Sequence, residues 1–144
     1  MKPRLSFYNR QRRQRSSLKL WRKIAERALP DCLAAAKSDQ SPLKQLEEVE
    51  ITFVTDRVIA RVHADFLADP TPTDVITFHH GEILISLDTA ARQSAEYGQP
   101  YEHEAALYII HGLLHLGDWD DHDPAEAAEM KTLQERILMT ALTK

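Results

Sequence analysis

Hydrophobic residues alternate with polar ones in some stretches of the chain and recur every three to four positions in others. Alternation predicts half-buried strands, and the longer spacing predicts amphipathic helices. We therefore expect short strands at residues 5–9, 49–53, 74–79 and 82–87. We expect helices at residues 17–28, 56–67, 88–97, 102–116 and 124–142, the first of them broken or restarted at Pro30.

The order of these elements predicts the fold class and the domain organisation. Helices follow most of the strands, which indicates an α+β (or α/β) fold: a small mixed β-sheet packed with about five helices as a single pair of layers. The polar residues 38–46 and the two prolines within residues 69–73 predict loops. We see no internal repeat, so residues 1–144 are expected to form one domain that includes the basic N-terminal segment 1–23.

Three histidines in one short segment carry the candidate chemistry. Residues 111–122 read HGLLHLGDWDDH. Four positions separate His111 from His115, so on a helix both imidazoles project from one face and can share an ion. The alternative is a pair of core histidines without a metal, but buried imidazoles need polar partners, which a metal would supply. Nitrogen ligands favour zinc, and three of them leave one tetrahedral position open, as in catalytic sites.

Gly112 decides which zinc chemistry the segment favours. In HExxH peptidases the residue after the first histidine is a glutamate that acts as general base. Gly112 takes that position here, so a peptidase of this type would lack its base.

Three motifs resemble those of the YbeY family, which are bacterial metal-dependent endoribonucleases of ribosomal RNA maturation. They are HGLLHL with the acidic turn and histidine that follow it, PTDVITF at residues 72–78, and GEILIS at residues 81–86. Met130, Gln134 and Glu135 also match the family's terminal helix. The likeness runs from about Glu48 to the C-terminus.

The resemblance implies a site and a function. The site is one zinc ion per chain, bound by His111, His115 and His122. The function is that of a single-strand-specific zinc-dependent endoribonuclease in ribosomal RNA processing (16S rRNA 3′ end maturation) and ribosome quality control. The partners are then ribosomal RNA and the small ribosomal subunit. The alternatives are a zinc metallopeptidase-like hydrolase, or a non-enzymatic ribosome-assembly factor whose metal is structural.

This chain departs from the family pattern in its metal motif. The family has five residues between its second and third histidines, and six separate His115 from His122. Counted without a gap, the third ligand position falls on Asp121. We expect His122 to be the ligand, with Asp121 as the alternative. The arginine that many members carry before the PTDV segment is absent, and no general base is identified.

Charge is unevenly distributed along the chain. Residues 1–23 contain nine of the eighteen Lys and Arg residues and no acid, although the net charge is −4. The cluster at residues 10–15 predicts contact with a polyanion such as RNA; a solvated loop and a transit peptide are the alternatives. No apolar run reaches the roughly 20 residues that span a membrane. No secretory segment is visible, and Cys32 is the single cysteine, so we expect a cytoplasmic protein.

Overall fold

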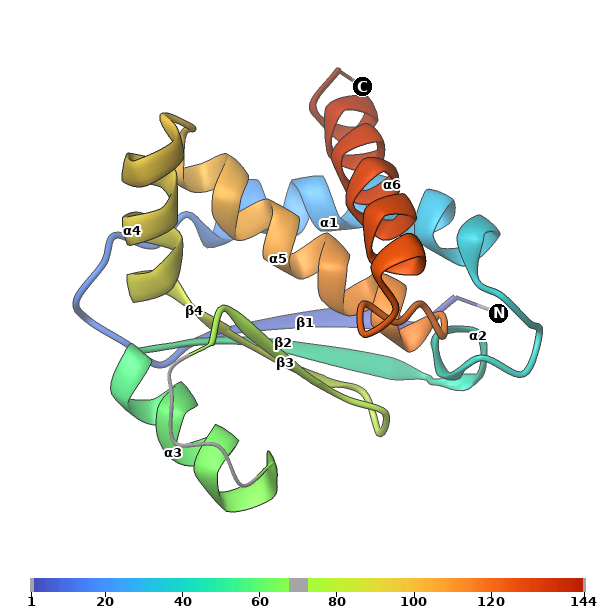
Figure 1. Ribbon diagram of the computed structural model, residues 1–144, viewed down its shortest axis with the longest axis horizontal. Coiled ribbons are helices and arrows are strands. Elements are labelled where there is room, and N and C mark those ends of the chain that lie inside the picture. Colours follow the sequence, from blue (N-terminus) through green and yellow to red (C-terminus); the bar gives the residue numbers. More distant parts are fainter. Residues whose placement is uncertain (1, 68–72, 144) are drawn as a thin grey trace.

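A mixed β-sheet forms the centre of the molecule in a computed structural model that describes residues 2–67 and 73–143. Its strands are β1 (Arg4–Asn9), β2 (Glu48–Val54), β3 (Val75–Phe78) and β4 (Glu82–Ser86). They lie in the order β1-β2-β4-β3 (Figure 1). The first three in that order are parallel, and β3 is antiparallel to β4. The predicted strands and the mixed sheet are therefore confirmed.

The described residues also form six helices, and α1, α3 and α5 pack directly on the sheet, which confirms the α+β class. They are α1 (Leu18–Ala35), α2 (Pro42–Gln45), α3 (Asp56–Leu67), α4 (Leu87–Tyr97), α5 (Tyr101–Leu116) and α6 (Pro124–Thr143). The short α2 lies where the sequence predicts only a loop. In Figure 1, α1, α4, α5 and α6 lie on one side of the sheet and α3 lies on the other. The second face of the sheet is therefore partly covered as well, in addition to the expected pair of layers.

The predicted break at Pro30 is wrong, because α1 continues through this residue as one helix. A proline inside a helix removes one backbone hydrogen bond and costs about 3 kcal/mol. Buried side chains lie on both sides of it, including Trp21, Leu29 and Cys32. Burial of a large apolar side chain contributes about 1.5–3 kcal/mol, so packing of α1 against α5 and α6 outweighs the lost hydrogen bond.

Helix α5 is the most buried helix and positions the candidate site. It packs against α1, α4 and α6, and its other neighbours include α2 and the hairpin of β3 and β4. Ile110, Leu113 and Leu114 have no exposed surface. Because the rest of the helix is held in the core, the one face that carries polar side chains is fixed relative to β3.

Two sequence predictions concern residues 68–72, which lie outside the described residues. They are part of the proline-containing loop and the stretch in which the family arginine is absent. Within the described residues, no helix is both long and apolar enough to cross a membrane.

Candidate metal centre

His111 and His115 face each other on the exposed face of α5. Their Nε2 atoms are 3.0 Å apart, and the ring planes meet at 81°. The side chains are 19% and 23% exposed, so both rings are partly accessible to solvent. The i,i+4 spacing brings the rings together, as the sequence predicts.

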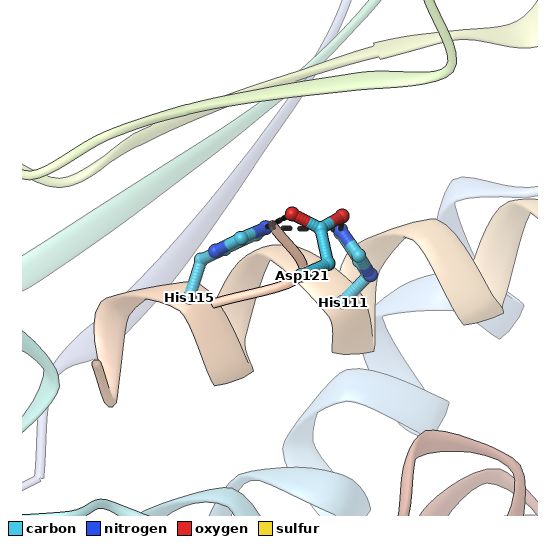
Figure 2. A group of neighbouring side chains, drawn as sticks. All are labelled: His111, His115 and Asp121. Atoms are coloured by element: carbon cyan, nitrogen blue, oxygen red, sulfur yellow. Dashed lines mark hydrogen bonds and ion pairs between the residues drawn. The ribbon is translucent and has the colours of Figure 1, made fainter. Parts of the chain in front are cut away.

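The third side chain at this point is Asp121. Its Oδ2 lies 3.5 Å from Nε2 of His111, and its Oδ1 lies 3.8 Å from Nε2 of His115. Figure 2 shows the carboxylate turned back over the two rings. The structure therefore brings His111 and His115 together with the alternative third ligand.

His122, the expected third ligand, lies outside this group. Its side chain is 89% exposed, and Nδ1 is hydrogen-bonded to the Asp120 carboxylate. The backbone N–H of His122 donates to the same carboxylate at 3.0 Å. That pairing raises the pKa of His122 above its usual value and keeps the imidazole over Asp120.

The turn between α5 and α6 is held in place by the end of α1 and the segment that follows it. Ser41 Oγ donates to the Asp118 carboxylate at 2.7 Å, and the Trp119 indole N–H donates to the carbonyl of Ala35 at 2.9 Å. Asp118 has a φ of 72°, a left-handed conformation that reverses the chain direction directly after α5. These contacts position Asp121 over the histidines although it lies in an exposed turn.

Gln134 of α6 contacts His111 on the ring nitrogen that points away from His115. Its Oε1 lies 3.0 Å from Nδ1 of His111. An amide oxygen only accepts hydrogen bonds, so Nδ1 carries the proton and Nε2 is left with a free lone pair. The sequence places Gln134 in the family's terminal helix but gives no indication of this contact, which depends on how α6 packs on α5.

Electrostatics favour the neutral form of the His115 ring. Burial lowers the pKa of His115, and the neighbouring His111 lowers it further. Neutral imidazole is the form that binds a metal ion. The Asp121 carboxylate would balance part of the charge of a divalent ion.

A cavity of about 480 Å³ opens beside the three side chains. Thr73 and Asp74 of the PTDVITF motif line it. Asp74 also accepts a hydrogen bond from the backbone N–H of Val75 at 2.8 Å, so it stabilises the start of β3 at the same time. His63 of α3 and Trp119 are among its other lining residues.

A second cavity of about 350 Å³ adjoins the first at Asp74, His111 and Asp121. Glu104, which is one of its lining residues, precedes His111 by two turns of α5. Burial raises the pKa of Glu104, and the nearby Asp74 carboxylate adds to the shift. The candidate metal group thus lies where two cavities meet, which leaves it open to a large substrate.

The three side chains fit a transition metal. Ligand atoms about 2.0–2.1 Å from a tetrahedral zinc lie roughly 3.3 Å from one another. The three separations here, 3.0, 3.5 and 3.8 Å, bracket that value. Two ring nitrogens and a carboxylate that face one point need a cation or a shared proton between them.

Comparison with known proteins identifies the family. The family model described as endoribonuclease YbeY matches residues 6–141, nearly the whole chain. The chain belongs to the YbeY family. The resemblance seen in the sequence motifs is thereby confirmed, and it extends into the basic N-terminal segment.

Individual relatives support the assignment to the YbeY family. An endoribonuclease YbeY of Symbiobacterium thermophilum is 34% identical, with 83% of each chain covered. One from Myxococcus xanthus is 38% identical, but the match covers 67% of this chain and 38% of that protein. The solution structure of TM1509 from Thermotoga maritima is similar in fold, with a TM-score of 0.58 at 20% identity, and covers 95% of this chain and 88% of that one.

Proposed function

We propose that this protein is a zinc-dependent endoribonuclease that cleaves single-stranded RNA during ribosomal RNA processing. The proposed step is maturation of the 16S rRNA 3′ end, with a further role in ribosome quality control, and the partners are ribosomal RNA and the small ribosomal subunit. The observation that carries the proposal is the group of His111, His115 and Asp121 at the junction of two open cavities in a member of an endoribonuclease family. The single cysteine, Cys32, is buried and unpaired, which suits a reducing cytoplasm.

The side chains at the metal group and in the adjoining cavity have separate roles in this proposal. His111 and His115 bind one ion per chain through Nε2, and Gln134 keeps the His111 proton on Nδ1. A divalent ion, when bound, supplies a Lewis acid for the phosphodiester oxygens and lowers the pKa of a water nucleophile. Thr73 and Asp74 line the cavity that would hold the nucleotides next to the cleaved bond.

The geometry favours one of the two candidates for the third ligand. Asp121 is within 4 Å of both ring nitrogens, whereas His122 is exposed and hydrogen-bonded to Asp120. A set of two histidines and one carboxylate binds zinc and also suits iron. We therefore propose zinc at His111, His115 and Asp121, with His122 in competition for the third position.

The peptidase alternative loses support at Gly112. A Cβ at this position would lie 2.8 Å from side-chain atoms of Ile83, so the position faces the sheet and not the cavity. A glutamate there would neither fit nor reach the metal. The remaining alternative is an assembly factor with a structural metal. It predicts that removal of a metal-binding side chain lowers the stability of the fold.

His115→Ala separates the enzymatic and structural alternatives. A catalytic metal predicts that the variant loses bound zinc and RNA cleavage but keeps its helical circular dichroism and most of its thermal stability. His103→Ala is the matched control, because His103 is a half-buried histidine of the same helix that does not line the cavity beside His115. Wild-type cleavage must also stop on addition of a chelator. Cooperative unfolding of His115→Ala at a much lower temperature would favour the structural metal, and undiminished cleavage would place the activity elsewhere.

A further inference from the structure

A third cavity, with three arginines in its wall, lies at the edge of the sheet where the parallel strands end. Because β1, β2 and β4 run in the same direction, their carboxyl ends share this edge. In Figure 1 the segment after β1 passes here beside the first turns of α3 and α4. The cavity measures about 840 Å³ and shares no lining residue with the one beside the metal group. Ligands of open α/β sheets commonly bind beyond the carboxyl ends of the strands.

Three guanidinium groups from separate elements line this cavity. Arg13 belongs to the basic segment after β1, Arg57 to α3 and Arg92 to α4. Arg10 and Arg12, which precede Arg13 in the same segment, are exposed. The basic cluster that the sequence shows is therefore extended in space by arginines from two distant parts of the chain.

Hydrogen bonds fix residues 13–15 of the basic segment beside this cavity. Gln14 Nε2 and Arg13 Nε donate to Oδ1 of Asp88 at 3.0 and 3.3 Å. The Tyr101 hydroxyl donates to the carbonyl of Arg15 at 2.8 Å. The segment is thus tied to α4 and α5, which argues against an unattached solvated loop.

The two acids of the cavity wall are already engaged. Asp56 accepts hydrogen bonds from the hydroxyl groups of Ser86 and Thr89 and pairs with Arg92. Asp88 accepts from the backbone N–H of Asp56 in addition to its two contacts with the basic segment. Their negative charge is therefore balanced by these internal partners and does not oppose an incoming anion at full strength.

Of the three arginines in the cavity wall, Arg13 and Arg92 are paired with Asp88 and Asp56, and the guanidinium of Arg57 is available to a ligand. It forms no ion pair with any residue in the described ranges. It also lies in the first turn of α3, where the helix dipole disfavours a cation. Local structure does not account for an arginine at this position, whereas an anion in the cavity would.

We propose that this cavity binds backbone phosphates of the RNA, with Arg57 and Arg13 in the wall and Arg12 at the rim. The proposal rests on the proposed function, since it takes RNA as the substrate. Guanidinium groups donate two parallel hydrogen bonds to a phosphate, and such contacts are independent of base sequence. The site would hold the RNA at a distance from the metal group, so that binding and cleavage use different residues.

Charge reversal tests the site without disturbing the metal group. The double variant Arg12→Glu/Arg57→Glu changes two exposed arginines, neither of which has an ion-pair partner among the described residues. An acid in the first turn of α3 is favourable, so the fold should be retained. The matched control is Lys23→Glu/Arg136→Glu, which makes the same change in net charge at exposed positions outside the cavity. Thermal unfolding of both proteins verifies the fold.

The measurement is binding of a fluorescent single-stranded RNA to metal-free protein across a salt series. We expect the cavity variant to bind at least about tenfold more weakly at low salt, with the slope of log K against log salt reduced by about 0.7 for each lost phosphate contact. The control should bind within about twofold of wild type. An unchanged slope for the cavity variant, or an equal loss in both variants, would overturn the phosphate site.

Failure of the proposed function has a different signature. If metal-loaded wild-type protein cleaves RNA and the cavity variant binds RNA normally, the phosphate site is wrong but the nuclease proposal stands. Wild-type protein that neither binds nor cleaves RNA would remove both.

Discussion

Gly112 of α5 lies directly against Ile83 of β4. A Cβ at position 112 would be 2.8 Å from both Cδ1 and Cγ2 of Ile83, closer than real Cβ atoms approach other carbons. The glycine therefore lets α5 lie close to an interior strand of the sheet. The same contact explains why this position of the motif holds no catalytic glutamate.

Gly112→Ala should destabilise the protein although alanine is the better helix former. Helix propensity alone predicts a gain of about 1 kcal/mol, whereas overpacking of a core contact costs about 1–3 kcal/mol. We expect overpacking to dominate, because Ile83 is a fully buried, β-branched residue of β4 and cannot easily move away from α5. Denaturant titration gives the free energy of unfolding.

Ile83→Ala provides the control background, since it removes every Ile83 atom that the new Cβ would meet. In this background Gly112→Ala should be neutral or stabilising. If Gly112→Ala stabilises the otherwise unchanged protein, the close packing of α5 on β4 is not what requires the glycine.

Gln134 should set the metal affinity of the site without being a ligand. Gln134→Ala removes the acceptor for the His111 Nδ1 proton, so the ring can rotate or change tautomer. Loss of such a supporting contact typically lowers metal affinity 10–100-fold. Competition with a chromophoric chelator measures the zinc affinity directly.

Glu135→Ala is the neighbouring control, because Glu135 is exposed on α6 and does not line either cavity beside His111. It should leave zinc affinity unchanged. Equal losses in the two variants would mean that α6 acts through general stability and not through the hydrogen bond to His111.

Asp56 should make the stability of the fold depend on acid pH. Burial opposes ionisation of Asp56, but hydrogen bonds from Ser86, Arg92 and Thr89 outweigh it and hold its pKa below the usual 3.8. A carboxyl with a lowered folded-state pKa stabilises the fold above that pH and loses the effect as the pH falls through the folded-state value. Asp56→Asn should therefore cost about 1–2 kcal/mol at neutral pH, and the difference from wild type should shrink on acidification below pH 3.8.

Asp39→Asn serves as the comparison, because the Asp39 side chain is 90% exposed in its ion pair with Lys44. Exposed pairs of this kind contribute little, so its unfolding free energy should stay close to that of wild type at every pH. A difference between Asp56→Asn and wild type that persists at acid pH would mean that Asp56 acts by packing and not by charge.

Local patterns were sufficient for most elements of the fold. Alternation at Val49, Ile51 and Phe53 predicts β2, and the i,i+4 spacing of His111 and His115 predicts how their rings meet. These properties depend only on the geometry of one strand or one helix. Pro30 shows the limit, because the burial that keeps α1 continuous comes from helices that follow it in the chain by about seventy residues or more.

The parts of the site that the sequence did not predict depend on contacts between distant segments. The Asp121 carboxylate is positioned by Ser41 and Ala35, which bind the turn just ahead of it. Gln134 reaches His111 only because α6 packs on α5. Arg57 joins the basic segment only because β1, β2 and β4 end at one edge of the sheet. Spacing along the chain carries none of this information.

The third metal ligand can be identified by removal of each candidate in turn. Asp121→Ala should lose most of the bound zinc, because its carboxylate lies 3.5 and 3.8 Å from the two ring nitrogens. His122→Ala should keep full occupancy, because this imidazole is exposed and engaged by Asp120. Elemental analysis of untagged protein measures the zinc content per chain.

Two conservative variants make the assignment sharper. Asp121→His restores the three-imidazole set of the family at the ungapped position, and it should retain zinc in a His122→Ala background as well. Asp121→Asn keeps the size of the side chain but removes its charge, so it should bind zinc weakly if the carboxylate is the ligand. Full occupancy in Asp121→Ala combined with loss in His122→Ala would show that the turn rearranges around the metal to present His122, as the gapped reading of the motif expects.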